Sequence, residues 1–144
     1  MNYQNILAAI DFSDSSNTAL QRAASIAKGS GAKLHVAHAI EPLTYRGVPY
    51  REIFSPDSQI EERAQAQKVL TEAVNGLGED HAPASVELLD GDPRNVIVKH
   101  ADKIGADLIV LGAHGHGRLH DVLLGSIASH ISQTATCSVL IVKN

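Results

Sequence analysis

Residues 107–118 read DLIVLGAHGHGR, and this stretch decides the fold that we expect. The apolar run at 107–111 has the length of a strand, and such runs are typical of strands buried on both faces of a parallel sheet. A glycine-rich loop, residues 112–118, follows directly. Glycines allow tight turns and let a ligand approach the backbone. The stretch therefore predicts a parallel α/β sheet with a ligand site beyond the end of this strand.

The rest of the chain alternates strand patterns with helix patterns. Four further strands are expected at residues 6–10, 34–40, 86–89 and 138–142. Small apolar residues at helical spacing fill the segments between successive strands. Parallel strands need crossover helices, and those crossovers are right-handed. We therefore predict one α/β domain over residues 1–144, a three-layer, doubly wound sheet of five parallel strands with four helices.

Helix boundaries are marked by capping residues. Asp92 and Pro93 predict the N-cap and first turn of the third helix, and Gly105 predicts its end. Apolar residues at helical spacing predict the last helix, and we expect Leu124 to lie in it. The connection at residues 41–56 is too long for a tight turn, so we expect it to be mobile or to carry function.

Composition excludes several classes of protein. Of the 144 residues, 44% are hydrophobic and 19% are charged, so the chain can bury a core. Aromatic residues make up 3%, which disfavours both base stacking and a flavin site. A net charge of −4 argues against a nucleic-acid partner. The lone Cys137 excludes an internal disulfide, and no apolar run has the length of a membrane span, so we expect a cytoplasmic protein.

An acidic residue and three glycines form the candidate site. Ligands of open parallel sheets bind where the strand order reverses, so Asp11 would face the glycine loop if the first and fourth strands are neighbours. Gly112, Gly115 and Gly125 follow a Gly-x2-Gly-x9-Gly-Ser spacing that ends in Ser126. The last pair lies near a helix start, where amides and the helix dipole favour phosphate. Taken alone, this glycine spacing is better explained by glycines that form loops and let a helix pack closely on the sheet than by a nucleotide site.

Two better-known nucleotide motifs are missing. Gly112 and Gly117 have the gap of a P-loop, but Arg118-Leu119 stands where Lys-Ser/Thr is required. The first strand is not followed by Gly-x-Gly-x-x-Gly, so a standard dinucleotide site is not supported.

Several segments match one known family. They are LIVLGAHG at 108–115, LLGS at 123–126, SVLIV at 138–142, DFS at 11–13, VAHAI at 36–40 and GDP at 91–93. Over essentially its whole length the chain resembles the universal stress protein family, and its glycine spacing resembles that of the ATP-binding branch. The resemblance implies a Rossmann-like fold of the adenine nucleotide alpha hydrolase-like type. It also implies a nucleotide-dependent regulator or binding module in a stress response.

The resemblance also assigns roles within an ATP site. Asp11 would contact ribose, the backbones of Ala9 and Ala39 would frame adenine, and Leu111 would line its pocket. The residues that would approach ribose and phosphates are Gly112, Gly115, Gly125, Ser126, Ile127 and Ala128. Near the phosphates, His116 and Arg118 would supply positive charge and donors. Magnesium would be held by the phosphates rather than by side chains, and no residue is given a catalytic role.

Alternatives remain at this stage. His114, His116 and His120 have spacings that suit zinc, with His38 and Asp11 as further ligands, although we favour phosphate contacts for this loop. A slow Mg-dependent ATP hydrolase is a second possibility.

Two further expectations concern signalling and assembly. A receiver-like domain would use Asp90 as phosphoacceptor and Lys143 as its partner. Family members commonly dimerise through the last strand, so we expect a homodimer through residues 138–142. We expect no nucleic-acid or membrane partner.

Overall fold

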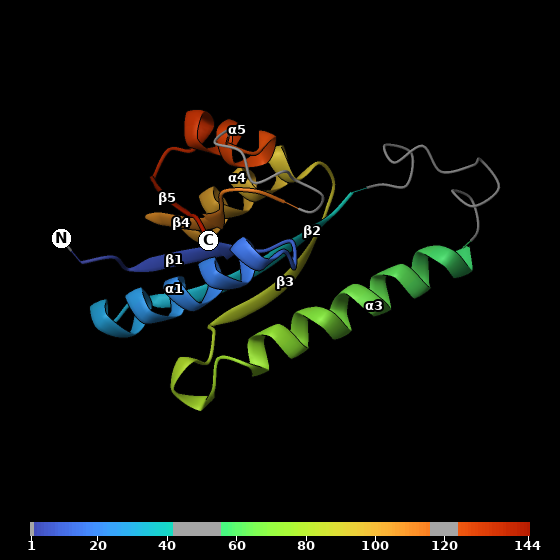
Figure 1. Cartoon of the computed structure of the whole chain (residues 1–144), viewed down its shortest axis with the longest axis horizontal. Coiled ribbons are helices and arrows are strands. Elements are labelled where there is room, and N and C mark those ends of the chain that lie inside the picture. The colour runs from blue at the N-terminus through green and yellow to red at the C-terminus, as the bar shows by residue number, and fades with distance from the viewer. Residues whose placement is uncertain (1, 42–55, 116–123) are drawn as a thin grey trace.

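The computed structural model describes residues 2–41, 56–115 and 124–144. In this part of the chain five parallel strands form one sheet (Figure 1): β1 (Asn5–Ala9), β2 (Lys33–Ile40), β3 (Ser85–Asp90), β4 (Leu108–Gly112) and β5 (Ser138–Val142). Their order is β3-β2-β1-β4-β5, so β1 and β4 are neighbours and β3 and β5 are the two edges. The predicted doubly wound parallel sheet is confirmed.

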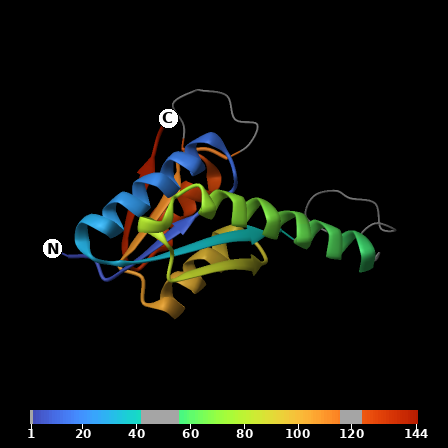
Figure 2. The same ribbon diagram turned by 90° about the horizontal axis from the view of Figure 1, so that it is seen from below.

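Helices cover both faces of this sheet. Those in the described ranges are α1 (Asp14–Ser30), α3 (Pro56–Asn75), α4 (Pro93–Ile104) and α5 (Ser126–Thr134), with a short 3-10 helix η2 (Glu79–His81) before β3. One apolar core joins the sheet to α1 and α3, and a second joins it to α4 and α5. Figures 1 and 2 show this three-layer arrangement from two sides. The predicted three layers are therefore confirmed.

The central strand shows why these residues form such a sheet. Side chains alternate along a strand, and Ile6 and Ala8 pack into the core under α1 and α3, whereas Leu7 and Ala9 pack into the core under α4 and α5. Burial on both faces requires a continuous apolar run. Small residues on α1, such as the fully buried Ala19, let that helix lie close to the sheet.

The capping predictions are confirmed at α4. The side chain of Asp92 accepts a hydrogen bond from the backbone N–H of Arg94, Pro93 occupies the first turn, and Gly105 ends the helix with a φ of 64°. Ser13 caps α1, and its hydroxyl accepts from the backbone N–H of Ser16. Left-handed Gly31 ends that helix. These ends are readable from sequence because each depends on one or two neighbouring residues.

The start of the last helix differs from the prediction. Leu124 lies before α5 and is 37% exposed, so its assignment to the helix was wrong. Gly125 is the N-cap in extended conformation, and its carbonyl accepts the first helical bond from Ser129. Leu124 fits the helical spacing by residue type alone. Among the described helices, none is long and apolar enough to cross a membrane.

A polar cluster lies beneath α4 at the amino end of the sheet. His35 Nδ1 and Ser85 Oγ form a hydrogen bond of 2.7 Å. The buried His100 of α4 has its Nδ1 3.8 Å from an oxygen of Glu87. Burial lowers the pKa of His35 below its ordinary value of 6.5, and the charges of His100 and Lys33 lower it further.

This cluster predicts that acid destabilises the protein. Because the folded state holds the pKa of His35 down, the unfolded chain takes up that proton first as the pH falls. The free energy of unfolding should therefore keep its highest value above about pH 6.5 and decrease as the pH falls below that value. For one proton the decrease is at most about 1.4 kcal/mol per pH unit. Urea titrations at about pH 7.5 and about pH 5.5 measure the difference.

Histidine variants test the assignment of this effect. His35→Asn keeps a hydrogen-bonding amide near Ser85 but removes the titration, so it should flatten the pH dependence. His81→Asn, in η2, makes the same substitution outside this cluster and serves as the comparison variant. Equal slopes in wild type and His35→Asn would contradict the prediction.

Candidate functional site

The site lies at the carboxyl end of the sheet, between β1 and β4. These two strands pair in parallel, with Ala9 opposite Leu111. The chain leaves β1 for α1 on one face and leaves β4 for α5 on the other, so their following loops diverge and open a crevice. The condition on which the sequence prediction depended, adjacency of the first and fourth strands, is confirmed.

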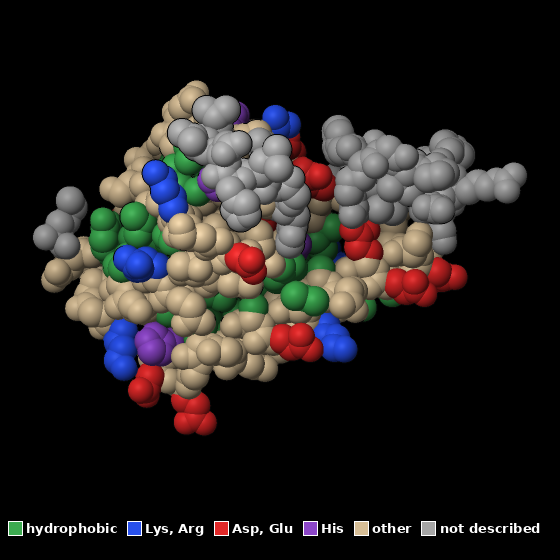
Figure 3. Space-filling view, viewed as in Figure 1, with side chains coloured by type: hydrophobic (Ala, Val, Ile, Leu, Met, Phe, Trp, Pro, Cys, Tyr) green, Lys and Arg blue, Asp and Glu red, His purple; other side chains and the backbone are tan. Residues whose placement is uncertain are grey.

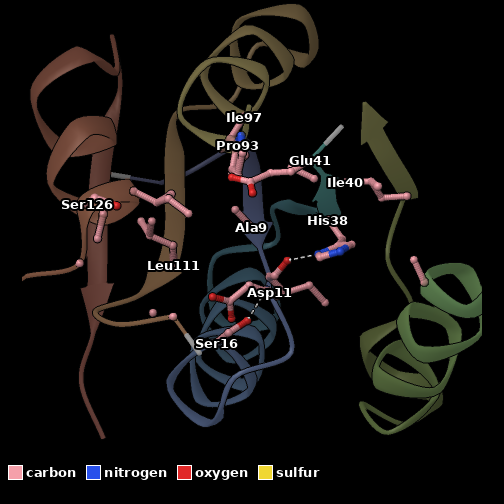
Figure 4. Close-up of a pocket in the computed structure, with 18 of the residues that line it drawn as sticks. Ala9, Asp11, Ser16, His38, Ile40, Glu41, Pro93, Ile97, Leu111 and Ser126 are labelled. Atoms are coloured by element: carbon pink, nitrogen blue, oxygen red, sulfur yellow. Dashed lines mark hydrogen bonds between the residues drawn. The ribbon is translucent and has the colours of Figure 1, made fainter. Parts of the chain in front are cut away.

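A cavity of about 470 Å³ occupies this crevice. Ten of the predicted site residues line it: Ala9, Asp11, Ala39, Leu111, Gly112, Gly115, Gly125, Ser126, Ile127 and Ala128. His116 and Arg118 lie outside the described residues. Figure 4 shows Asp11, Leu111 and Ser126 around the same space, from three different elements of the fold. The volume is in the range of small-molecule sites.

Sequence reasoning missed the other side of the cavity. Its remaining lining residues are Ile10, Ser16, His38, Ile40, Glu41, Glu62, Ala66, Pro93, Ile97 and Ala113. They come from β2 and the residue after it, from α1, α3 and α4, and from the loops after β1 and β4, and they follow no common motif. The helical spacing of Ile97 predicts only that it faces the sheet. Its position at the carboxyl end of the strands depends on how α4 packs on the sheet, which helical spacing does not specify.

The turn after β1 fixes the carboxylate of Asp11. Its Oδ1 atom accepts hydrogen bonds from the backbone N–H of Ser13, at 3.0 Å, and from the Ser13 hydroxyl. Its backbone N–H donates to Ser16 Oγ at 2.9 Å. A carboxylate held at its own backbone and at one oxygen has little rotational freedom. Asp11 is therefore oriented before any ligand arrives.

The glycine loop lies against this turn. A Cβ atom at Gly115 would lie 2.9 Å from Oδ2 of Asp11, and one at Gly125 would lie 3.0 Å from the carbonyl oxygen of Ala113. The Ser15 hydroxyl donates to the carbonyl of His114 at 2.7 Å, and Gly125 N–H donates to the carbonyl of Ala113 at 2.8 Å. The motif glycines thus allow the close approach of two loops and a helix start.

The amino end of α5 faces the cavity. Gly125 is its N-cap and makes no side-chain capping bond. The first backbone N–H groups of a helix have no acceptor within the helix, and the positive end of the helix dipole adds to their attraction for anions. Ser126, Ile127 and Ala128 all line the cavity at this point. The arrangement can bind a phosphate through backbone donors.

Backbone donors make a basic surface unnecessary. In the space-filling view, basic and acidic side chains are interspersed on the visible face (Figure 3). The net charge of −4 is therefore compatible with an anionic ligand, provided that binding is local.

The zinc hypothesis gains no support from the described residues. They contain no group of three or more His, Cys, Asp or Glu residues placed to hold a metal ion. His38 Nδ1 lies 2.7 Å from the carbonyl oxygen of Ile10. His116 and His120 fall outside the described part of the chain. Zinc binding by the histidine loop stays an untested alternative.

The receiver-like alternative is wrong. Asp90 ends β3 and Lys143 follows β5, and these strands form opposite edges of the sheet. Asp90 also forms an ion pair with Arg63 of α3. A phosphoacceptor and its lysine have to share one site, which this strand order prevents.

Comparisons with known proteins agree with this geometry. The sequence model described as "Universal stress protein family" matches residues 2–143. Universal stress protein A homolog 1 of Coxiella burnetii is 39% identical over 148 residues, which cover 99% of this chain and 97% of that protein.

Solved structures of similar proteins extend the comparison. A universal stress protein in complex with cAMP matches with a TM-score of 0.73 and 30% identity, covering 99% of this chain and 98% of the other. The universal stress protein from Archaeoglobus fulgidus in complex with dAMP matches with a TM-score of 0.69 and 28% identity, covering 99% and 100%. Because the family model covers residues 2–143 and the 39% identical relative matches over nearly the whole of both chains, this chain belongs to the universal stress protein family.

Proposed function

We propose that this protein binds an adenine nucleotide in the cavity between β1 and β4, and that ATP is the preferred ligand. The observation that carries the proposal is the convergence of one oriented carboxylate, a glycine loop and a helix amino end on one cavity. Two similar structures, described as complexes with cAMP and dAMP, support the class of ligand. ATP has a ribose diol for the carboxylate and phosphates for the amides.

The cavity suggests an orientation for the ligand. Adenine would lie near the backbones of Ala9 and Ala39, against the apolar side chains of Leu111 and Ile97. Asp11 would accept hydrogen bonds from the ribose hydroxyls. The phosphates would lie at Gly112, Gly115 and the start of α5, at residues 125–128. Magnesium would be held by phosphate oxygens, and His116 and Arg118 would add positive charge.

We propose binding and regulation rather than turnover. Among the described residues, the donors around the proposed phosphate subsite are backbone N–H groups and the Ser126 hydroxyl, which can bind phosphate. Rapid hydrolysis needs a group that positions the attacking water. ATP occupancy would instead change a conformational or partner-binding equilibrium. Slow Mg-dependent hydrolysis is measured in the same samples by following phosphate release.

Assembly through β5 is a further part of the proposal. β5 is an edge strand, and Val139, Leu140 and Ile141 are half-buried apolar residues on it. Apolar edge strands favour pairing with another chain. A homodimer is the expected state, and a monomer in sedimentation at micromolar concentration would contradict it.

The proposed function is tested by calorimetry with ATP and magnesium. Nucleotide released from the denatured protein, identified by chromatography, shows what is carried through purification. Wild type should bind ATP with a 1:1 stoichiometry per chain. Wild type that binds no adenine nucleotide would overturn the proposal.

Ser126→Ala should weaken ATP binding by about fivefold. The substitution removes the hydroxyl donor, whereas the backbone N–H groups of the first turn of α5 remain. Ser126 is exposed, so stability should be unchanged. Calorimetry with ATP and with adenosine separates the two effects, because adenosine lacks phosphates and should lose nothing. Equal losses for both ligands would contradict a phosphate contact.

A further inference from the structure

The turn that carries Asp11 contains an unusual backbone conformation. Phe12 has a φ of +67°, and no other non-glycine residue in the described ranges has a positive φ. This left-handed conformation is unfavourable for a bulky side chain and persists where the surroundings enforce it. Ile10, on the other side of Asp11, is held to β2 through its backbone N–H, which donates to the carbonyl of Ala37.

His38 of β2 contacts both neighbours of Asp11. Its Nδ1 atom lies 2.7 Å from the carbonyl oxygen of Ile10. Its ring packs on the ring of Phe12, with centroids 4.4 Å apart and planes at 37°. A carbonyl oxygen only accepts, so Nδ1 carries the proton and donates it to this bond. Figure 4 shows His38 reaching across the cavity wall toward the end of β1.

These two contacts constrain the residue between them. The hydrogen bond fixes the peptide unit that enters Asp11, and the ring contact supports the left-handed residue that leaves it. The Asp11 side chain then directs Oδ1 to Ser13 and Oδ2 toward Gly115. A rotated peptide at Ile10 would turn the carboxylate away from the glycine loop.

We propose that His38 is a positioning residue, which sets the direction of the Asp11 carboxylate and thereby the preference of the site for a ribose with free hydroxyls. This inference rests on the proposed function, since it concerns the same nucleotide site. His38 acts through the Ile10 carbonyl and the Phe12 ring, and its effect on the ligand is indirect. Preference for the ribose hydroxyls is the quantity that it controls.

Three His38 variants and two nucleotides test the inference. Calorimetry compares ATP with 2′,3′-dideoxy-ATP, which lacks both ribose hydroxyls. Wild type should prefer ATP by about tenfold or more. His38→Leu should reduce this preference to about twofold or less by weakening ATP binding while leaving dideoxy-ATP binding nearly unchanged.

Conservative variants identify the acting atom. The amide nitrogen of Asn occupies roughly the place of Nδ1, so His38→Asn should restore most of the preference. Gln places its amide near Nε2, so His38→Gln should not. On an Asp11→Asn background, His38→Leu should have no further effect on the ratio, because the carboxylate through which it acts is gone.

Val36→Ala is the matched control. Val36 is fully buried on β2, packs in the core under α1 and α3, and does not line the cavity. The substitution costs stability and should leave the ATP preference unchanged.

The outcomes separate the inference from the proposed function. Wild type that binds no adenine nucleotide overturns both. Wild type that binds ATP while His38→Leu keeps the full preference overturns the inference alone. Equal weakening of both nucleotides in His38→Leu, or equal rescue by Asn and Gln, also overturns it, because each points to a general structural role.

Discussion

Gly112→Ala is expected to lower the free energy of unfolding by about 3 kcal/mol. A Cβ atom at the end of β4 would lie 2.5 Å from Ser15 Oγ and 2.7 Å from the backbone nitrogen of Ser16. The second atom belongs to the first turn of α1 and moves only if the helix moves. That turn is tied to the Ser13 cap, because Ser16 N–H donates to its hydroxyl. The added methyl group therefore acts on the packing of α1 against β4.

Urea unfolding measures this loss, with Gly29→Ala as the control. Gly29 lies within α1, and a Cβ atom there would meet nothing within 4 Å. Alanine at an open helix position is favourable by about 0.5–1 kcal/mol relative to glycine. The two Gly→Ala changes should thus shift stability in opposite directions. A Gly112→Ala protein that unfolds at the wild-type urea concentration would show that α1 does not pack closely on β4.

Local signals explain why most of the fold was predictable. Asp92-Pro93 and Gly105 define α4 because capping depends on neighbouring residues. Apolar runs define the strands because both faces of a central parallel strand are buried. The order of the strands has no local signal. The adjacency of β1 and β4, on which the site depends, results from crossovers that place distant segments together.

The candidate site was predictable on its motif side only. The glycine spacing and Asp11 have fixed positions in the sequence, and the resemblance to a family gave them roles. His38 was considered only as a metal ligand, yet it hydrogen-bonds Ile10 across 28 residues of sequence. Such a contact follows from the register of β1 on β2, which sequence periodicity does not contain. Leu124 shows the opposite error, since its apolar character suits a helix that its extended neighbour Gly125 excludes.

Gly115→Ala is expected to weaken ATP binding by about fiftyfold, with a smaller loss of stability than Gly112→Ala. A Cβ atom there would lie 2.9 Å from Oδ2 of Asp11, the end of a side chain rather than a backbone atom. The carboxylate can rotate away only by giving up its hydrogen bonds to Ser13, which costs less than moving a backbone atom. Rotation removes the acceptor that the proposed ribose contact needs, and hydrogen bonds to charged groups contribute about 1.5–3 kcal/mol.

Two glycines of one motif thus have separable roles, and the contrast makes the prediction strict. Gly115 has no positive φ, so alanine fits its backbone, and the expected loss falls on binding. Gly112→Ala should show the reverse. Its stability should be lower than that of Gly115→Ala. Its loss of ATP affinity should be smaller, when binding is measured without urea and well below the thermal midpoint of the variant. Calorimetry and urea unfolding on both variants, with Gly29→Ala beside them, give a two-by-two comparison. A Gly115→Ala protein with wild-type ATP affinity would show that Asp11 does not contact the nucleotide. Equal destabilisation of both variants would contradict the separation of their roles.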